Sequence, residues 1–342
     1  MNERKTNLKS LSEEEIFDFV AINGLQPYRA RQLIHWIYRK FAESIEDITE
    51  FSKVLREKLC KIAYISNLKI INVLKSKDLA EKFLFMLEDN NLIESILIPE
   101  DKRLTLCVSS QVGCSMRCSF CQTGKSGFIR NLKAYEIVDQ IITVDRFIKQ
   151  RNITNVVFMG MGEPLLNFTE LVEAVRRIKE YIGISKRRIT VSTCGIVPSI
   201  LKMTEKLADV NLAVSINAAS DDLRSELMPI NKKFPLKLLL SACKEYSKKT
   251  GNKITFEYVL IKDKNDSEKD ALSLYNLIRG IRCKVNLIPF NEQFNIEYKR
   301  PEMDKILEFQ NILNKRGIRT LIRESRGLDI QAACGQLRLC HL

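Results

Sequence analysis

Three cysteines within eight residues constrain this chain more than any other feature of its sequence. Cys114, Cys118 and Cys121 are separated first by three residues and then by two. Cysteine thiolates are the usual ligands of iron–sulfur clusters, and a four-iron cluster normally takes four of them. A structural zinc site also needs four ligands and usually pairs its cysteines two and two. Because this run holds three, we expect one [4Fe-4S] cluster per chain with one iron left open, rather than three ordinary buried cysteines.

The charge and cysteine content indicate a nucleic-acid partner and a reducing compartment. The 342 residues include 55 Lys and Arg against 42 Asp and Glu, a net charge of +13. Such an excess favours binding to phosphate backbones, although a generally basic protein has the same composition. The ten cysteines do not resemble the disulfide framework of a small secreted protein, and the first ten residues are polar. No apolar run approaches the roughly 20 residues that span a bilayer, so we expect a cytoplasmic protein without membrane contact.

Residues 1–65 are predicted to form a small helical domain. Ser12 and Glu15 have the spacing of a capping box, and helical patterns follow it, after Pro27 and over 52–62. The second helix carries Trp36 among several basic residues. Basic helices around an aromatic side chain could face RNA, although a tryptophan is more often part of a core. We expect an accessory domain that contacts RNA.

Residues 66–103 change to strand patterns, over 69–74, 82–87 and 92–98, with a tight turn at 89–91. They predict a linker with a short antiparallel extension that leads into the first core strand. From there to residue 342, strand and helix patterns alternate, which predicts a parallel sheet with helices outside, either open or curled into a barrel. Six main strands are fewer than the eight of a closed (β/α)₈ barrel. They are predicted at residues 104–109, 156–159, 188–192, 212–216, 254–261 and 285–289.

Polar residues and glycines gather where predicted strands end. Gly162 and Glu163 follow the strand at 156–159; a glycine lets the backbone approach a ligand, and a carboxylate can accept hydrogen bonds from an ammonium group. Each such feature alone is more often ordinary turn chemistry. Because the carboxyl ends of parallel strands meet at one edge, their shared position makes them candidates for binding a nucleoside. The other candidates at this edge are Ser192, Ser215, Ile216, Asn217 and Asn291.

The cysteine spacing after a predicted strand resembles the signature of the radical S-adenosylmethionine (SAM) superfamily. Over nearly its whole length the chain resembles the RlmN/Cfr family of RNA methyltransferases within it. Pro164 and residues 288–291 are more similar to the RlmN branch, which methylates adenine C2, than to the Cfr branch, which methylates C8. The segments that carry the resemblance are residues 28–32, 105–111, 124–132, 160–165, 186–188, 228–233, 286–291 and 333–337.

This resemblance implies a fold and a cofactor site. Residues 104–342 are expected to form a partial (β/α)₆ barrel, open on one side for a large substrate. Cys114, Cys118 and Cys121 are implied as ligands of the cluster, whose open iron binds SAM. Many relatives have histidine where this chain has Asn217, and an asparagine can still hydrogen-bond there. The implied SAM contacts are Gly162, Glu163, Ser192, Ser215, Ile216, Asn217 and Asn291.

The resemblance also implies a reaction. A first SAM methylates Cys334, and a radical derived from a second SAM takes a hydrogen atom from that methyl group. The carbon then joins C2 of an adenosine in 23S rRNA or tRNA. Cys107 releases the product and is left in a disulfide with Cys334, while Glu94 is the proton acceptor. From residue chemistry alone, Cys334 is no better a candidate than Cys243 or Cys283. The implied partners are 23S rRNA, tRNA and an electron donor of the flavodoxin or ferredoxin type, and we expect a monomer.

Three other interpretations are compatible with parts of the sequence. A methyltransferase acting on adenine C8 has the same machinery. A radical SAM activase that acts on a protein glycyl site explains the cluster, but it gives no role to Cys334, Cys107 or the basic excess. A non-catalytic RNA-binding protein with a structural iron–sulfur cluster belongs to a different class, and cleavage of SAM to 5′-deoxyadenosine excludes it.

Overall fold

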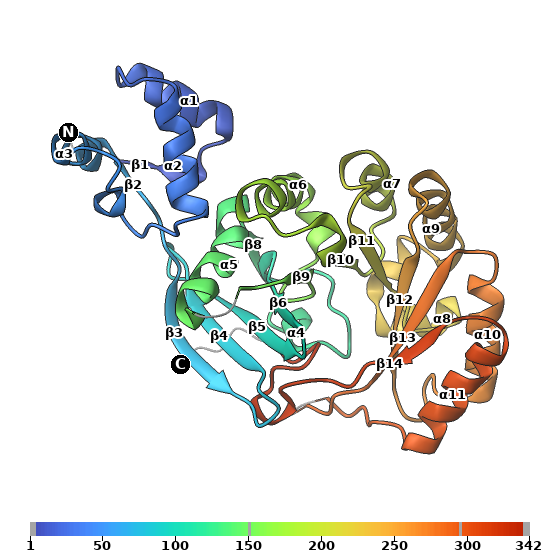
Figure 1. The fold of residues 1–342 in the computed structure, drawn as a ribbon. Coiled ribbons are helices and arrows are strands. Elements are labelled where there is room, and N and C mark those ends of the chain that lie inside the picture. The colour runs from blue at the N-terminus through green and yellow to red at the C-terminus, as the bar shows by residue number, and fades with distance from the viewer. Residues whose placement is uncertain (1–4, 150–151, 294–295, 338–342) are drawn as a thin grey trace.

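A computed structural model describes residues 5–149, 152–293 and 296–337 of the chain. A small helical unit at the N-terminus sits beside a large domain in which helices cover one long sheet (Figure 1). The small unit consists of α1 (Glu13–Ile22), α2 (Tyr28–Tyr38) and α3 (Lys53–Ile62), with β1 (Thr6–Asn7) and β2 (Ala63–Tyr64) paired in parallel. This arrangement confirms the three predicted helices.

Local chemistry explains where the first helix begins. Ser12 Oγ accepts a hydrogen bond from Glu15 N at 3.1 Å, and Ser12 N donates to Glu15 Oε2 at 2.7 Å. The predicted capping box is therefore formed, and it satisfies two backbone donors at the start of α1. Trp36 on α2 is half-buried and packs against the core, so the core interpretation of this side chain holds.

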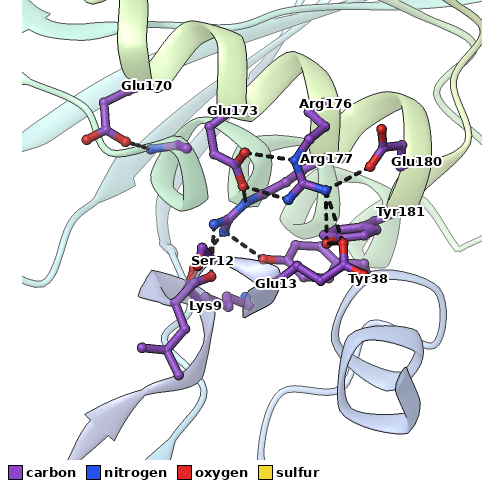
Figure 2. Close-up of polar contacts among 12 residues, drawn as sticks. Lys9, Ser12, Glu13, Tyr38, Glu170, Glu173, Arg176, Arg177, Glu180 and Tyr181 are labelled. Atoms are coloured by element: carbon purple, nitrogen blue, oxygen red, sulfur yellow. Dashed lines mark hydrogen bonds and ion pairs between the residues drawn. The ribbon is translucent and has the colours of Figure 1, made fainter. Parts of the chain in front are cut away.

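The helical unit is fixed to the large domain through α6 (Phe168–Arg177), as Figure 2 shows. The buried guanidinium of Arg177 donates to Lys9 O at 2.7 Å and to Leu11 O at 2.9 Å. It also donates to Tyr38 Oη at 2.9 Å and to Glu173 Oε1 at 2.6 Å. Because these acceptors come from both parts of the chain, one buried side chain joins the two units.

In the chain, the antiparallel extension follows the helical unit. It consists of β3 (Lys69–Lys75), β4 (Glu81–Met86) and β5 (Leu92–Glu100), and β5 pairs antiparallel with β6 (Arg103–Cys107). Asn90 in the β4–β5 turn has φ of +65°, a left-handed conformation that asparagine tolerates. The predicted strands and their turn are therefore confirmed.

The extension and the parallel strands form one sheet of ten strands, in the order β14-β13-β12-β11-β10-β9-β6-β5-β4-β3. All pairs from β6 to β14 are parallel. The barrel is open, because β14 and β3 are the two edges of the sheet. The six predicted strands and the partial barrel are confirmed, and β14 adds a short seventh parallel strand. The remaining strands are β9 (Asn155–Phe158), β10 (Ile189–Thr193), β11 (Asn211–Ser215), β12 (Ile254–Leu260), β13 (Cys283–Pro289) and β14 (Thr320–Ile322).

Helices that follow the parallel strands pack on the outside of the sheet (Figure 1). Their buried faces meet strand residues such as Val156, Val191 and Phe256, which are fully buried. The helices are α5 (Ala134–Ile148), α6, α7 (Val197–Lys206), α8 (Asp221–Leu227), α9 (Leu236–Thr250), α10 (Glu268–Ile278) and α11 (Met303–Lys315). In the parts of the chain that the structure describes, no helix combines the length and apolar character needed to cross a bilayer.

A small hairpin that the sequence did not predict frames the cysteine run. Strand β7 (Gln111–Gly113) pairs antiparallel with β8 (Phe128–Asn131), and α4 (Gln122–Lys125) lies between them. Helix α8 was also not predicted. Both are short elements, for which a periodic pattern has too few residues to be recognised.

Candidate active site

The carboxyl ends of the parallel strands surround a cavity of about 170 Å³. Its wall combines the cysteine run, the ends of β9 to β13 and the C-terminal segment around Cys334. The position at this edge of the sheet is the one predicted for an α/β fold. Ten of the predicted site residues line the cavity: Cys114, Cys118, Cys121, Gly162, Glu163, Ser192, Ser215, Asn217, Asn291 and Cys334.

The hairpin β7–β8 determines the path of the cysteine run. Cys114 N donates to Gly127 O at 2.7 Å, so the run begins at a backbone contact between the two strands. Gly113 has φ of +76°, and a Cβ there would clash with the Gly127 carbonyl and lie only 3.2 Å from Phe128 Cα. Glycine is therefore required at position 113 for both conformation and space.

The three cysteines of the run are largely removed from water. Burial raises the pKa of the Cys114 thiol to about 12, and it raises the pKa of Cys118 and Cys121 as well. Metal binding to these groups therefore has to displace protons. Within the described ranges, no three Cys, His, Asp or Glu side chains are placed to hold a single metal ion. Three thiols in one short run, rather than two pairs, are the donor set expected for a cluster with one open iron.

Glu163 lies buried in the turn after β9. Its Oε1 accepts from Leu165 N at 3.0 Å, and its Oε2 accepts from Cys194 N at 2.7 Å. Burial raises the pKa of this carboxyl group, and the two backbone donors oppose that shift. Glu163 also lines the cavity, so a ligand bound there can reach its carboxylate oxygens.

Two of the predicted SAM contacts, Asn217 and Ile216, are less favourably placed to bind a ligand in the cavity. Asn217 Oδ1 accepts from Val259 N at 2.9 Å, and its Nδ2 donates to Met228 Sδ at 3.2 Å, so both ends of its amide already have protein partners. Ile216 is fully buried behind the cavity wall. Their roles in SAM binding stay predictions.

Cys334 and Cys107 face a common space. A second cavity of about 80 Å³ is lined by both residues, together with Ile96 and Arg323, and Cys334 also lines the first cavity. Both cysteines are free thiols in this structure. Burial raises the pKa of Cys107 to about 12, and the guanidinium of Arg323 opposes that shift. The fold therefore brings together two thiols that are far apart in the sequence.

Glu94 lies on β5 and is buried, with 3% of its surface exposed. Its Oε1 is 3.2 Å from Lys82 Nζ on the neighbouring strand β4. It lines neither of the two cavities that Cys334 lines. This carboxylate is therefore buried and ion-paired rather than exposed on its strand.

Comparisons with known proteins agree with this geometry. Residues 108–275 match the radical SAM superfamily, and residues 6–65 match the N-terminal domain of ribosomal RNA large subunit methyltransferases. The dual-specificity RNA methyltransferase RlmN of Alcanivorax borkumensis is 45% identical, over 98% of this chain and 91% of that protein. The chain belongs to the RlmN family of radical SAM RNA methyltransferases. The probable RlmN of Thermoanaerobacter sp. (strain X514) is 44% identical, over 98% of each chain.

The whole fold is also similar to that of a solved radical SAM methyltransferase. The crystal structure of a radical SAM methyltransferase from Sphaerobacter thermophilus has a TM-score of 0.94 and 42% sequence identity, over 98% of this chain and 100% of that chain. The agreement covers 98% of this chain, so it extends over both the helical unit and the barrel of Figure 1.

Enzymes of this superfamily use a [4Fe-4S] cluster and SAM, and the RlmN-family cavity has features that suit both. Among the residues that the structure describes, Asn291 Oδ1 and Glu257 Oε2 have no hydrogen-bond partner; both atoms are buried acceptors, and both residues line the cavity. Buried acceptors are normally satisfied, so these two fit donors of a bound molecule, such as ribose hydroxyls or an amino group. The donor set of three cysteines fits the cluster.

Sequence reasoning missed Glu257 and Arg323. Glu257 lies in the middle of β12, where it is the one charged residue of the strand, and it is 4% exposed. Burial raises the pKa of its carboxyl group, while Arg323 opposes that shift. A single charged residue inside a buried strand was the signal that could have identified it. Arg323, just after β14, carried no comparable local signal.

Proposed function

We propose that this enzyme methylates C2 of a specific adenosine in 23S rRNA and in tRNA, with Cys334 as the carrier of the methyl group. The observation that carries the proposal is the shared cavity of Cys334 and Cys107, next to the run of Cys114, Cys118 and Cys121. A thiol that carries a methyl group needs both a source of that group and a second thiol to release it. Here the second thiol is Cys107, and the cavity next to the cysteine run is the proposed place for the methyl source, SAM.

In this proposal, Cys114, Cys118 and Cys121 hold the cluster and leave one iron open for SAM. The predicted contacts from Gly162 to Asn291 orient SAM in the cavity, and Glu257 adds a further acceptor. When bound, the two cofactors supply the methyl group of Cys334 and the radical that removes a hydrogen atom from it.

The chain's own residues carry out the remaining work. Adenine C2 is electron-poor, so a methyl cation finds no nucleophile there, whereas a carbon radical on the Cys334 side chain can add to it. Glu94 accepts the proton from C2, and the adduct radical also gives up one electron, which the cluster or the proposed electron donor would take up when bound. The thiolate of Cys107 then attacks the sulfur of Cys334, which forms a Cys107–Cys334 disulfide and breaks the bond from sulfur to the transferred carbon. The electron pair of that bond stays on the carbon, which takes up a proton to become the methyl group.

The N-terminal unit is proposed to grip the RNA. Base modification requires an adenosine taken out of its stack, and a basic accessory surface provides the sequence-independent affinity for that step. Arg31, Arg39 and Lys40 are exposed on or just after α2. The proposal also includes a flavodoxin or ferredoxin type electron donor, a monomeric enzyme and a cytoplasmic location.

The test is to reconstitute the cluster anaerobically, add SAM, a reductant and RNA, and identify the modified nucleoside by mass spectrometry. We expect 2-methyladenosine and 5′-deoxyadenosine. Formation of 8-methyladenosine would assign the enzyme to the C8 reaction instead, and an absence of SAM cleavage would favour a non-catalytic role.

Two cysteine variants test the proposed roles. Cys334→Ala should abolish methylation, because no sulfur remains to carry the methyl group. Cys107→Ala should instead trap a covalent protein–RNA adduct, visible on a denaturing gel. Cys243→Ala is a suitable control, because Cys243 is buried on α9 and lines neither of the two cavities that Cys334 lines.

A further inference from the structure

Lys82 is a buried cation that the proposed chemistry leaves without a role. It lies on β4 and is 8% exposed. Its Nζ is 3.2 Å from Glu94 Oε1 and donates to the carbonyl oxygen of Gln331 at 3.3 Å. Burying an ammonium group is costly unless it is paired and hydrogen-bonded. The ammonium of Lys82 therefore joins the Glu94 carboxylate to a backbone position three residues before Cys334.

The register of the sheet places these groups on one face. Lys82 pairs with Ile96 on β5, and Ile96 pairs with Cys107 on β6. Directly paired residues project to the same face, and strands lie about 4.8 Å apart, so the Cα atoms of Lys82 and Cys107 are about 10 Å apart. Glu94 is two residues from Ile96 along β5 and projects to that face as well. The three groups thus share the side of the sheet on which Cys334 lies.

The segment that carries Cys334 is supported at both ends. At one end, Gly327 N donates to Asp78 Oδ2 at 2.9 Å, and Asp329 accepts from Ser76 Oγ at 2.5 Å. These contacts hold residues 327–329 against the turn between β3 and β4. At the other end, Gly335 O accepts from Gln122 N at 2.8 Å, beside the cysteine run. Between these two supports, Lys82 binds the carbonyl oxygen of Gln331 and so connects the segment to Glu94.

We propose that Lys82 is a positioning residue that holds the Glu94 carboxylate and the Cys334 segment in one arrangement. This inference rests on the proposed function. A base acts only within about 3 Å of the proton it removes, and a misplacement of about 1 Å can cost a hundredfold in rate. Lys82 contacts both the Glu94 carboxylate and the segment that carries Cys334. It therefore fixes the position of the proton acceptor relative to the methyl carrier, so that both can reach the same adenine.

The proposal separates early steps from late ones. Cleavage of SAM and methylation of Cys334 do not require a proton acceptor at adenine C2. The steps after the carbon has joined the base do require one. Loss of the Lys82 ammonium should therefore leave the early steps intact and stall the enzyme after the protein–RNA bond has formed.

The experiment uses reconstituted enzyme with SAM, reductant and an RNA substrate. Lys82→Met removes the ammonium and keeps the length of the side chain. We expect iron content, 5′-deoxyadenosine formation and methylation of Cys334 to match the unaltered enzyme. Release of methylated adenosine should fall at least about tenfold, because the base is misplaced. The covalent protein–RNA adduct should accumulate on a denaturing gel.

Three comparisons make the result specific. Lys82→Arg keeps a cation and should restore part of the product release. Lys75→Met on β3 removes an exposed lysine that pairs with Glu81 at 3.5 Å, and it should behave as the unaltered enzyme. The double variant Lys82→Met with Glu94→Gln leaves no unpaired buried charge, so it stays folded and should accumulate adduct as well.

Two outcomes overturn the proposal. If Lys82→Met releases methylated adenosine at the normal rate, Lys82 positions nothing. If it loses iron or the methylation of Cys334, its role is structural support alone. Failure of the proposed function is a different result, because the unaltered enzyme then forms neither 2-methyladenosine nor an adduct.

Discussion

Cys107 and Cys334 share a cavity, but the surroundings of Cys107 limit its reactivity. With its pKa raised to about 12 by burial, almost all of Cys107 is protonated at neutral pH. The thiolate is the reactive form, so attack by this residue depends on a neighbouring cation. Arg323 is the cation whose charge stabilises that thiolate. The reactivity of the predicted residue Cys107 therefore depends on Arg323, a residue that the sequence analysis did not include in the site.

Asp145 on α5 is a residue whose charge costs stability. Burial raises its pKa from 3.8 to about 6, and its Oδ1 accepts from Ile153 N at 2.9 Å. Between these two pH values, the folded protein holds a proton that the unfolded chain has lost. The free energy of unfolding therefore falls as pH rises through this range, by at most about 3 kcal/mol.

Asp145→Asn keeps the acceptor for Ile153 N and removes the charge. We expect it to raise the free energy of unfolding by about 1–2 kcal/mol at pH 8, and to change it little near pH 4. Urea unfolding followed by circular dichroism at both pH values measures the difference. An equal effect at both would show that the charge of Asp145 is not the cause.

At the scale of elements, the hairpin β7–β8 determines the shape of the cysteine run. Gly113 and Gly127 lie on opposite sides of it, and both have positive φ, +76° and +81°. A Cβ at Gly113 would meet the backbone of Gly127, whereas a Cβ at Gly127 has open space around it. A residue with a side chain would therefore be strained in its backbone at either position, but only at position 113 would the side chain also clash with neighbouring atoms.

This difference makes a matched pair of variants. Gly127→Ala should incur only the cost of a left-handed backbone, about 1–2 kcal/mol, and keep most of its iron. Gly113→Ala should also force the two strands apart and retain less than roughly half of the iron of the unaltered protein, because cluster binding depends on a preformed loop. Iron and sulfide analysis after identical anaerobic reconstitution decides between them. Equal iron content in the two variants would contradict the steric argument.

At the scale of the whole molecule, the helical unit and the barrel are joined through buried charges. Arg177 donates to backbone and side-chain acceptors of both parts (Figure 2). The ammonium of Lys9 is paired with Asp139 on α5, where both are buried. If the helical unit grips RNA as proposed, these contacts set the direction from which the RNA reaches the cavity.

Arg177→Met should therefore weaken both stability and RNA use. Loss of this buried cation leaves several acceptors unpaired, at a cost of about 3 kcal/mol in the free energy of unfolding. We expect a higher KM for RNA, while SAM cleavage without RNA is unchanged. Lys179→Met is the control, because the Lys179 side chain is 31% exposed and its ion pair with Asp209 lies within the large domain. If Arg177→Met has the KM of the unaltered enzyme, the docking of the helical unit does not affect RNA binding, and the prediction is contradicted.

The parallel strands and the grouping of the three cysteines could be predicted from the sequence. Cys114, Cys118 and Cys121 lie within eight residues, so their spacing alone brings them together. Strands such as β9 and β12 are apolar runs with their own local signal, and the right-handed connection of strand and helix then leaves few ways to arrange them. Resemblance to a known family supplied the roles of Cys107, Cys334 and Glu94, which residue chemistry alone left open.

Other features were decided only by the tertiary structure. The contacts of Lys82 with Glu94 and Gln331, and those of Arg177 with Lys9 and Leu11, join segments that are distant in the sequence. Patterns of spacing report on neighbours within a turn or a strand, because only those contacts recur at a fixed interval. A contact between distant segments depends on the packing of everything between them. Local sequence therefore determined which elements form, and packing determined which side chains meet.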